Sequence, residues 1–263
     1  MRFLVLGLWG VVLGCGPDRF TGGDAALPDG AQADQQSPAD TGADVRVDAM
    51  SGPCAFPTPP DTIFCADFET VSTPGMTWSS VDSTGGCTQL LEAPMPAPPI
   101  GGPKVFTSQV STTSGTRCNL VYEVNGVMSE PMLQFLVYQF HTTAGEIAFI
   151  GQIGYENYNL ALGVNGNGQL MIVESGGALP TGSVTTGLSA NLGGGTWHSV
   201  RLKVALGSSN IGVNVDGNDK YNGAPATTVN QGLGPKTHFI IGNQVSMGPF
   251  VHKFDAVVVF GKM

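Results

Sequence analysis

The chain reads Trp197-His198-Ser199-Val200-Arg201-Leu202-Lys203-Val204 and, shortly after, Ile211-Gly212-Val213-Asn214-Val215-Asp216-Gly217. In the first segment, apolar residues at 200, 202 and 204 alternate with polar residues at 199, 201 and 203. This alternation is typical of a strand with one buried and one solvated face. Asp-Gly is a frequent hairpin turn, and the chain returns through Lys220-Tyr221. The two segments therefore predict neighbouring antiparallel strands.

The same period of two recurs in other short segments from residue 104 onward, for example Leu133/Phe135/Val137 and Tyr158/Leu160/Leu162/Val164. Gly, Asn or Pro separates these segments, and the 263 residues include 38 Gly and 18 Pro. No long stretch has a helical period. Many short strands with regular turn signals predict an all-β sandwich or barrel.

In order and spacing these segments resemble the concanavalin A-like lectin/glucanase superfamily, and most closely its laminin G-like members. The resemblance is carried by the hairpin at 197–217 and by three further motifs, Phe64-Cys65-Ala66-Asp67-Phe68-Glu69, Phe239-Ile240-Ile241-Gly242-Asn243 and Phe254-Asp255-Ala256-Val257-Val258-Val259. It spans residues 62 to 261 and implies a two-sheet antiparallel jelly-roll sandwich.

The N-terminus has one positive charge at Arg2, followed by an apolar run up to Cys15. Because a membrane-spanning helix needs about 20 apolar residues, this run indicates a signal peptide. Val12-Leu13-Gly14-Cys15 resembles the lipobox of bacterial lipoproteins. That resemblance implies removal of residues 1–14 and a lipid-anchored Cys15 in the cell envelope, and Gly16 favours the outer membrane. The alternative is an ordinary signal peptide with an incidental cysteine.

Residues 15–52 are rich in Asp, Ala, Gly and Pro, with Phe20 as their one aromatic residue. Such a segment buries too little apolar surface to fold, so it predicts a disordered tether before a domain at 53–263. The irregular Asp spacing matches no calcium-binding loop. The domain itself has thirteen acidic and eight scattered basic residues. This balance excludes a nucleic-acid partner.

Four further cysteines lie at positions 54, 65, 87 and 118. An even number of cysteines in an exported domain predicts two disulfides, for which three pairings are possible. Proximity in the sequence favours Cys54 with Cys65 and Cys87 with Cys118. The spacing does not suit zinc, because no Cys-x-x-Cys is present and no histidine lies nearby at ligand spacing.

Enzymes of the concanavalin A-like superfamily have catalytic sequence motifs, and this sequence can be compared with them. Its glycoside hydrolases use Glu-x-Asp-x-x-Glu on one strand, but the segment from Glu146 has Ala148 and Gly151 at the later acidic positions. Its alginate-lyase-like members use Gln-Ile-His, and this chain reads Gln152-Ile153-Gly154. The four histidines, at 141, 198, 238 and 252, have no Gly-x-Ser-x-Gly partner motif. We therefore expect a domain without catalytic residues.

The resemblance also implies one structural calcium ion between the first and last strands. The matching acidic residues are Asp67, Glu69 and Asp255. Oxygen ligands suit Ca²⁺. The alternative is that Asp67 and Asp255 only accept hydrogen bonds from turn amides.

For a glycan site, Tyr155, Asn157 and Tyr158 form one candidate cluster, and Trp78 is a candidate stacking platform. We expect Trp197 in the core. The combined expectation is a cell-surface lipoprotein whose non-catalytic, lectin-like domain binds glycans or other surface molecules. Two alternatives are a structural or adhesive envelope protein with protein partners and a divergent polysaccharide hydrolase or lyase.

Overall fold

The computed structural model describes residues 61–69, 71–100, 102–111, 116–140, 146–176, 179, 182–226, 233–245 and 249–263. The predicted signal peptide, the lipidation site Cys15, the tether and Cys54 lie outside these residues. The described residues form fifteen strands and no helix, so no membrane-spanning helix is found among them. Every strand pair is antiparallel.

One sheet has eight strands in the order β13-β12-β11-β6-β15-β4-β3, with β1 also paired to β15. Its strands are β1 (Thr62–Ala66), β3 (Cys87–Glu92), β4 (Val105–Val110), β6 (Met132–Phe140), β11 (Trp197–Ala205), β12 (Asn210–Val215), β13 (Asn218–Gly223) and β15 (Phe250–Phe260). The other sheet has seven strands in the order β10-β9-β8-β7-β14-β5-β2. Its strands are β2 (Ser80–Ser83), β5 (Arg117–Asn125), β7 (Ile147–Gly154), β8 (Tyr158–Asn165), β9 (Gln169–Gly176), β10 (Ser183–Asn191) and β14 (Lys236–Val245).

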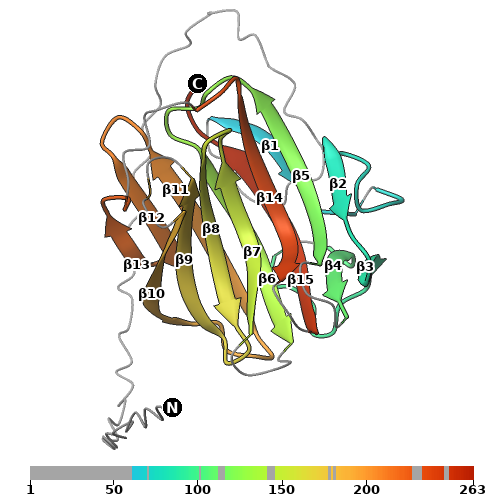
Figure 1. Cartoon of the computed structure of the whole chain (residues 1–263). Helices are drawn as coiled ribbons and strands as arrows, with labels where there is room; N and C mark the ends of the chain where they lie inside the picture. The colour runs from blue at the N-terminus through green and yellow to red at the C-terminus, as the bar shows by residue number, and fades with distance from the viewer. Residues whose placement is uncertain are drawn as a thin grey trace, which may run out of the picture. The chain divides into compact units, whose positions relative to one another are not determined.

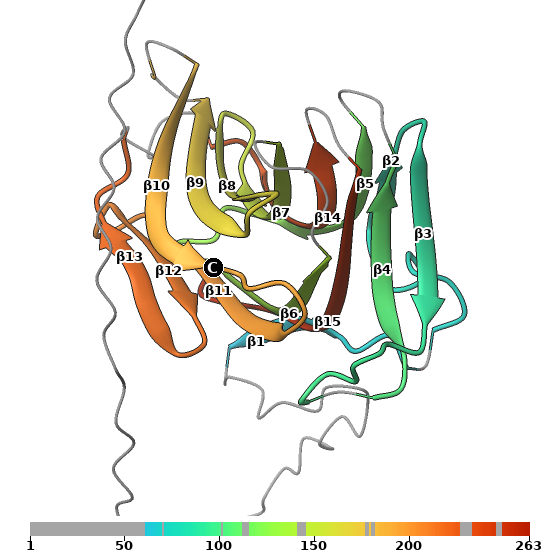
Figure 2. The ribbon, with the colours of Figure 1, turned by 90° about the horizontal axis from the view of Figure 1, so that it is seen from below.

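The two sheets lie face to face as two layers (Figures 1 and 2). Alternate residues of their strands fill the space between them and are almost fully buried, as at Val200/Leu202/Val204 in β11, Phe135 and Val137 in β6, and Leu160/Leu162/Val164 in β8. This arrangement confirms the predicted all-β jelly-roll sandwich. It leaves an outer face of each sheet available for function.

The predicted hairpin is present between β12 and β13. Val215 pairs with Asn218, and the two turn residues Asp216 and Gly217 have φ of 52° and 79°. Positive φ at both central residues matches the twist of the flanking strands, which is why Asp-Gly suits this turn.

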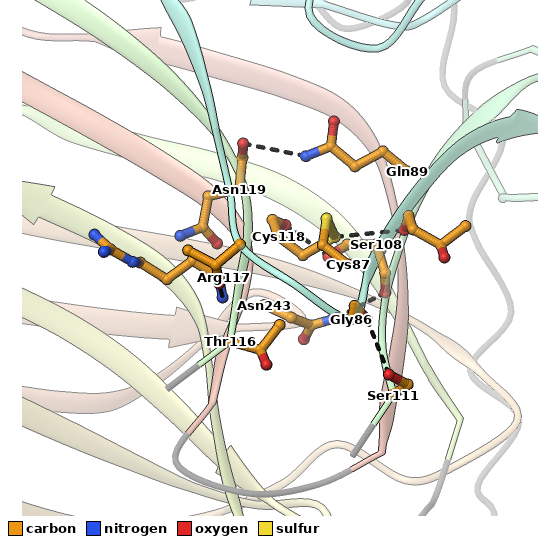
Figure 3. The surroundings of a disulfide bond; sticks show 12 residues. Gly86, Cys87, Gln89, Ser108, Ser111, Thr116, Arg117, Cys118, Asn119 and Asn243 are labelled. Carbon is orange, nitrogen blue, oxygen red and sulfur yellow. Dashed lines mark hydrogen bonds between the residues drawn. A yellow bond between two sulfur atoms is a disulfide. The ribbon is translucent and has the colours of Figure 1, made fainter. Parts of the chain in front are cut away.

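The Cys87–Cys118 disulfide is confirmed, with its Cα atoms 5.2 Å apart (Figure 3). It joins β3 of one sheet to β5 of the other. Around it, Ser108 Oγ donates to the Cys118 carbonyl and Gln89 Nε2 donates to the Asn119 carbonyl. Cys65 is also disulfide-bonded. Its predicted partner Cys54 lies outside the described residues.

The prediction that Trp197 belongs to the core is wrong. Trp197 shares the outward phase of Arg201, rather than the inward phase of Val200, and is half-buried on the outer face of the eight-stranded sheet. Its ring packs 5.5 Å from that of Tyr138, and its Nε1 donates to the Pro96 carbonyl at 2.9 Å. This hydrogen bond ties the indole to the segment between β3 and β4.

Candidate functional site

Three neighbouring strands bring polar side chains together on the outer face of the seven-stranded sheet. Strand β14 lies between β5 and β7, and His238 is paired with Glu123 on one side and with Gly154 on the other. Thr237 and Phe239, which flank His238, are fully buried, so the imidazole points outward. Paired residues on one sheet face lie about 5 Å apart. His238 therefore stands directly over Gly154.

The space above Gly154 is filled by this histidine. A Cβ atom built at position 154 would collide with Nε2 of His238 and with the side-chain oxygen of Asn159 in β8. In the sequence resemblance to alginate-lyase-like enzymes, Gly154 stands where the Gln-Ile-His triplet would have its histidine. Here an imidazole reaches the same place from the adjacent strand.

One amide contacts the ring, and a second amide contacts the first. Gln152 Nε2 donates to Asn159 Oδ1 at 2.9 Å, and His238 Nε2 lies 3.3 Å from the same oxygen. Because an amide oxygen only accepts hydrogen bonds, this contact favours the tautomer with its proton on Nε2 and the lone pair on Nδ1. Asn159, itself held by Gln152, thus orients the ring with Nδ1 free to accept a proton.

Burial favours the neutral form of the His238 ring. Burial lowers the pKa of His238 below 6.5, and the nearby Glu123 carboxylate opposes this shift. Glu123 is itself paired with Lys236, whose Nζ lies 2.6 Å from Oε2. A neutral, oriented imidazole at neutral pH is the state that a general base requires.

A pocket of about 300 Å³ opens beside the ring, lined by Glu156, Pro235, Lys236 and His238. A substrate group placed there would meet the imidazole and a lysine ammonium together. Sequence reasoning missed His238, because Gly154 and His238 are far apart in the chain and only the β7–β14 register brings them together. Their complementary sizes, a glycine opposite a histidine, become visible only once that register is known.

The predicted glycan cluster is not at this site, and three of its four members are buried. Tyr155 and Tyr158 are each 1% exposed and Trp78 is 7% exposed, so none offers a ring face for sugar stacking. Asn157 is exposed. The prediction is therefore wrong for the three aromatic residues.

The physical reason is the phase of the strand. Tyr158 has the inward phase of Leu160 and Leu162, and its hydroxyl donates to buried Glu174 at 2.9 Å. The Tyr155 hydroxyl donates to the Met128 carbonyl at 3.0 Å. Each ring fills the core while its hydroxyl keeps a partner, and burial raises the pKa of both hydroxyls.

The three predicted calcium ligands lie near one another. Asp255 is fully buried and Asp67 is almost so. Burial, assisted by the charges of Glu69 and Asp67, raises the pKa of Asp255 to about 8. Asp255 Oδ1 accepts from the Ala256 amide, whereas its Oδ2 has no hydrogen-bond partner.

The other two carboxylates also accept hydrogen bonds from backbone amides. Asp67 Oδ1 accepts from the Glu69 amide, and Glu69 Oε1 accepts from the Lys104 amide. Across the described part of the chain, no three His, Cys, Asp or Glu side chains gather into a group that could hold a metal ion. Calcium at these residues stays a prediction.

The two positions at which the hydrolase motif would have its later acids, Ala148 and Gly151, face the core from strand β7. Ala148 is fully buried, and a side chain at Gly151 would meet the ring of Phe135 in the core. Neither position can present a carboxylate to solvent.

Among the other histidines, His198 Nδ1 lies 2.7 Å from Asp216 Oδ2, and the nearby Thr196 hydroxyl donates to the Gly193 carbonyl. These hydrogen bonds connect the start of β11 to the loop that precedes it and to the Asp216 turn.

No family model and no curated protein sequence matches this chain. Solved structures do share its fold. The endo-beta-1,4-glucuronan lyase of the fungus Trichoderma reesei has a TM-score of 0.55 and 17% identity, over 76% of this chain and 96% of that one. A sialidase has a TM-score of 0.50 and 12% identity over 76% of this chain, which corresponds to 18% of the sialidase. Alginate lyase A1-II′, a member of polysaccharide lyase family-7, has a TM-score of 0.49 and 14% identity over 66% of this chain and 84% of that one.

This comparison corrects the functional expectation. The prediction of a non-catalytic domain, whether lectin-like or adhesive, is wrong, because the fold is shared with a polysaccharide lyase over nearly that enzyme's whole length. The prediction rested on the absence of a histidine from Gln152-Ile153-Gly154, whereas the imidazole of His238 lies over Gly154 from the neighbouring strand β14.

Proposed function

We propose that this protein is a polysaccharide lyase that cleaves a uronic-acid-containing polysaccharide, with His238 as its general base. The observation that carries the proposal is the imidazole of His238 over Gly154, where the lyase triplet would place its own histidine. The shared fold with a glucuronan lyase supports the substrate class.

The proposed reaction is a β-elimination. His238 Nδ1 removes the proton from C5, next to the uronate carboxyl group, and the electron pair forms a C4–C5 double bond. The C4–O bond breaks, and the departing oxygen takes up a proton. None of the five tyrosines lies on this face. The imidazolium formed in the first step is therefore the proposed donor of that proton.

The surrounding residues have supporting roles in this proposal. Lys236 and the amide groups of Gln152 and Asn159 can donate hydrogen bonds to the uronate carboxyl group. Donors fixed in advance stabilise the negative charge that develops on that group as the C5 proton leaves. Asn159 is a positioning residue, because its oxygen lies against Nε2 and leaves Nδ1 as the base.

A histidine transfer between strands tests this proposal. We compare kcat/KM on glucuronan for the unchanged protein, His238→Ala, Gly154→His, and the double variant Gly154→His/His238→Ala. Loss of a general base costs about 10²- to 10⁴-fold. We expect His238→Ala to lose activity by that factor, Gly154→His to unfold at lower temperature because two rings compete for one space, and the double variant to regain part of the activity.

Two outcomes would contradict the proposal. One is His238→Ala with full activity. The other is a double variant that folds as stably as the unchanged protein but is no more active than His238→Ala. Thermal unfolding of all four proteins distinguishes a lost base from a lost fold.

We further propose that the protein is exported and held at the bacterial outer membrane through lipid on Cys15, with residues 15–52 as a tether. The lipobox-like Val12-Leu13-Gly14-Cys15 and the Asp-rich composition support this proposal. A Cys15→Ala variant should appear in the soluble fraction instead of the membrane fraction. Recovery of this variant with the membrane would contradict the lipid anchor.

We also retain calcium as a proposed structural ion near Asp255. The buried Oδ2 atom without a partner supports it, since a cation would supply the missing contact. Asp255 and Asp67 would be the side-chain ligands. The ion would neutralise this acidic cluster between the first and last strands.

A further inference from the structure

The outer face of the eight-stranded sheet has a polar trough, formed by β6, β11, β12 and β13. Its volume is about 260 Å³. Two rows of paired residues cross it. In one row Lys203 is paired with Gly212, and Gly212 with Asn222. In the other row Arg201 is paired with Asn214, and Asn214 with Asp219.

The floor of the trough lies at Gly212. Gly212 has no side chain, and a Cβ atom built there would meet only Lys203 Cβ at 3.8 Å and the Tyr221 carbonyl oxygen at 3.9 Å. These are ordinary contact distances. Gly212 is therefore not required by crowding, and its absent side chain leaves open space between a lysine and an asparagine.

Within the described part of the chain, the two cations of this trough form no ion pair with a carboxylate. Elsewhere in the described ranges, Arg117, Lys236 and Lys253 each pair with an acidic side chain. Neither Arg201 nor Lys203 has such a pair among these residues. The two are on the same face of one strand, about 7 Å apart, so their charges repel each other unless an anion lies nearby.

Arg201 is held in place without losing its charge. Its Nε and Nη2 both donate to Gln134 Oε1, at 3.1 and 2.9 Å, and its guanidinium lies 5.9 Å from the centre of the Phe260 ring. Both partners are neutral. The arginine therefore presents a fixed positive charge to the trough.

The remaining groups suit hydroxyls. Asn222 lies across Gly212 from Lys203, and its amide can both donate and accept hydrogen bonds. Asp219 accepts from Asn214 Nδ2 at 2.9 Å and keeps capacity for a further donor. A ligand that matches this set has an anionic group at the Lys203 side and hydroxyls at the Asn222 and Asp219 side.

From this arrangement we propose that the trough is a second binding site for a carboxylated polysaccharide, separate from the face that carries His238. A sugar acid combines a carboxylate with several hydroxyls on one ring, which is the chemistry that these side chains match. The trough lies on the opposite sheet. The proposal therefore does not require the reaction assigned to His238.

Calorimetry tests the number of sites. The probe is a short glucuronate oligosaccharide, titrated into the full-length protein carrying His238→Ala, so that no cleavage occurs. We expect two binding sites per molecule. Gly212→Val fills the trough with a residue that favours strands, and it should reduce the number from two to one with unchanged thermal unfolding.

Charge variants refine the test. A hydrogen bond to a charged group contributes about 1.5–3 kcal/mol, so Lys203→Ala should weaken the trough site by roughly tenfold or more. Lys220→Ala is the matched control, because it removes the same charge from β13 outside the trough lining. It should leave both sites unchanged.

The outcomes separate the two proposals. If Gly212→Val leaves the number of sites unchanged, the trough is not a binding site and this inference is overturned. If the parent binds one oligosaccharide and Gly212→Val binds none, the trough is confirmed, whereas the His238 face does not bind uronate. Polyglutamate that displaces the sugar at equal carboxylate concentration would show a site for acidic peptide and would also overturn the inference.

Discussion

The outer faces of the two sheets use charge in different ways. On the seven-stranded sheet, the cations Lys236 and Arg117 are paired with acidic side chains, and the distinctive group is the imidazole of His238 among neutral amides. On the eight-stranded sheet, Lys253 is paired with Glu92, but Arg201 and Lys203 at the trough form no ion pair with an acid among the described residues, and no histidine lines the trough. The first face is suited to moving a proton, and the second is suited to holding an anion.

This difference predicts that changes on the two faces have different kinetic effects. His238→Ala should lower kcat on glucuronan by about 10²- to 10⁴-fold, the range for loss of a general base. Lys203→Ala should leave kcat unchanged, because its face takes no part in the proposed elimination. Steady-state kinetics of both variants provides the comparison, and equal loss of kcat in the two would remove the distinction between the faces.

The buried acid at the first and last strands predicts a large effect of pH on stability. The folded-state pKa of Asp255 is raised to about 8, so the folded protein binds this proton more tightly than the unfolded chain does. Its stability contribution is therefore present at low pH and is lost as the pH rises from about 4 to about 8. Asp255→Asn should abolish this loss and be more stable than the parent at pH 8 by a few kcal/mol.

Calcium would reverse the sign of this dependence. If the proposed ion binds Asp255, added calcium should raise the melting temperature of the parent at pH 8 and have no effect on Asp255→Asn. Chelation should lower the melting temperature of the parent alone. A parent whose melting temperature is unchanged by calcium and by chelator has no structural calcium ion at these residues.

Asn159 tests how the His238 face is organised. Asn159→Ala removes the acceptor that lies against Nε2 and leaves Gln152 without its partner. We expect kcat to fall about tenfold, less than for His238→Ala, with KM little changed. Asn159→Asp keeps an acceptor and should restore the orientation, while its charge raises the pKa of His238 and moves the acid limb of the pH–rate profile upward. An unchanged profile in Asn159→Asp would argue against contact between this residue and the His238 ring.

The smallest expected effect concerns Glu123. Its carboxylate opposes the lowering of the pKa of His238, so Glu123→Gln should lower that pKa further. Because the neutral imidazole is the proposed base, the acid limb of kcat/KM should move to lower pH, with the plateau unchanged within about twofold. Movement to higher pH would contradict this assignment of charges.

Part of this molecule could be predicted from the sequence because its determinants are local. The alternation at 199–204, the Asp216-Gly217 turn and the pairing of Cys87 with Cys118 each depend on residues near one another in the chain, and each is confirmed. The candidate site is different. His238 and Gly154 acquire meaning only through the register between β14 and β7, which no local pattern specifies.

The aromatic residues show a second limit. The alternation with Leu160, Leu162 and Val164 predicts an inward phase for Tyr158, yet its aromatic ring beside Tyr155 and Asn157 also makes it a candidate stacking surface for a glycan. The buried carboxylate of Glu174 supplies the hydrogen bond that makes burial possible. That partner comes from the neighbouring strand β9, and its position could not be read from the segment around Tyr158.

The His238 face is proposed to cleave a uronate polymer by elimination. Ultraviolet absorption by the new C4–C5 double bond tests this proposal when the full-length protein acts on glucuronan, with alginate as a second substrate and a neutral glucan as control. We predict that absorbance grows in step with new chain ends on a uronate polymer and is lost in His238→Ala. New chain ends without absorbance, or no cleavage of either uronate polymer, would contradict the claim.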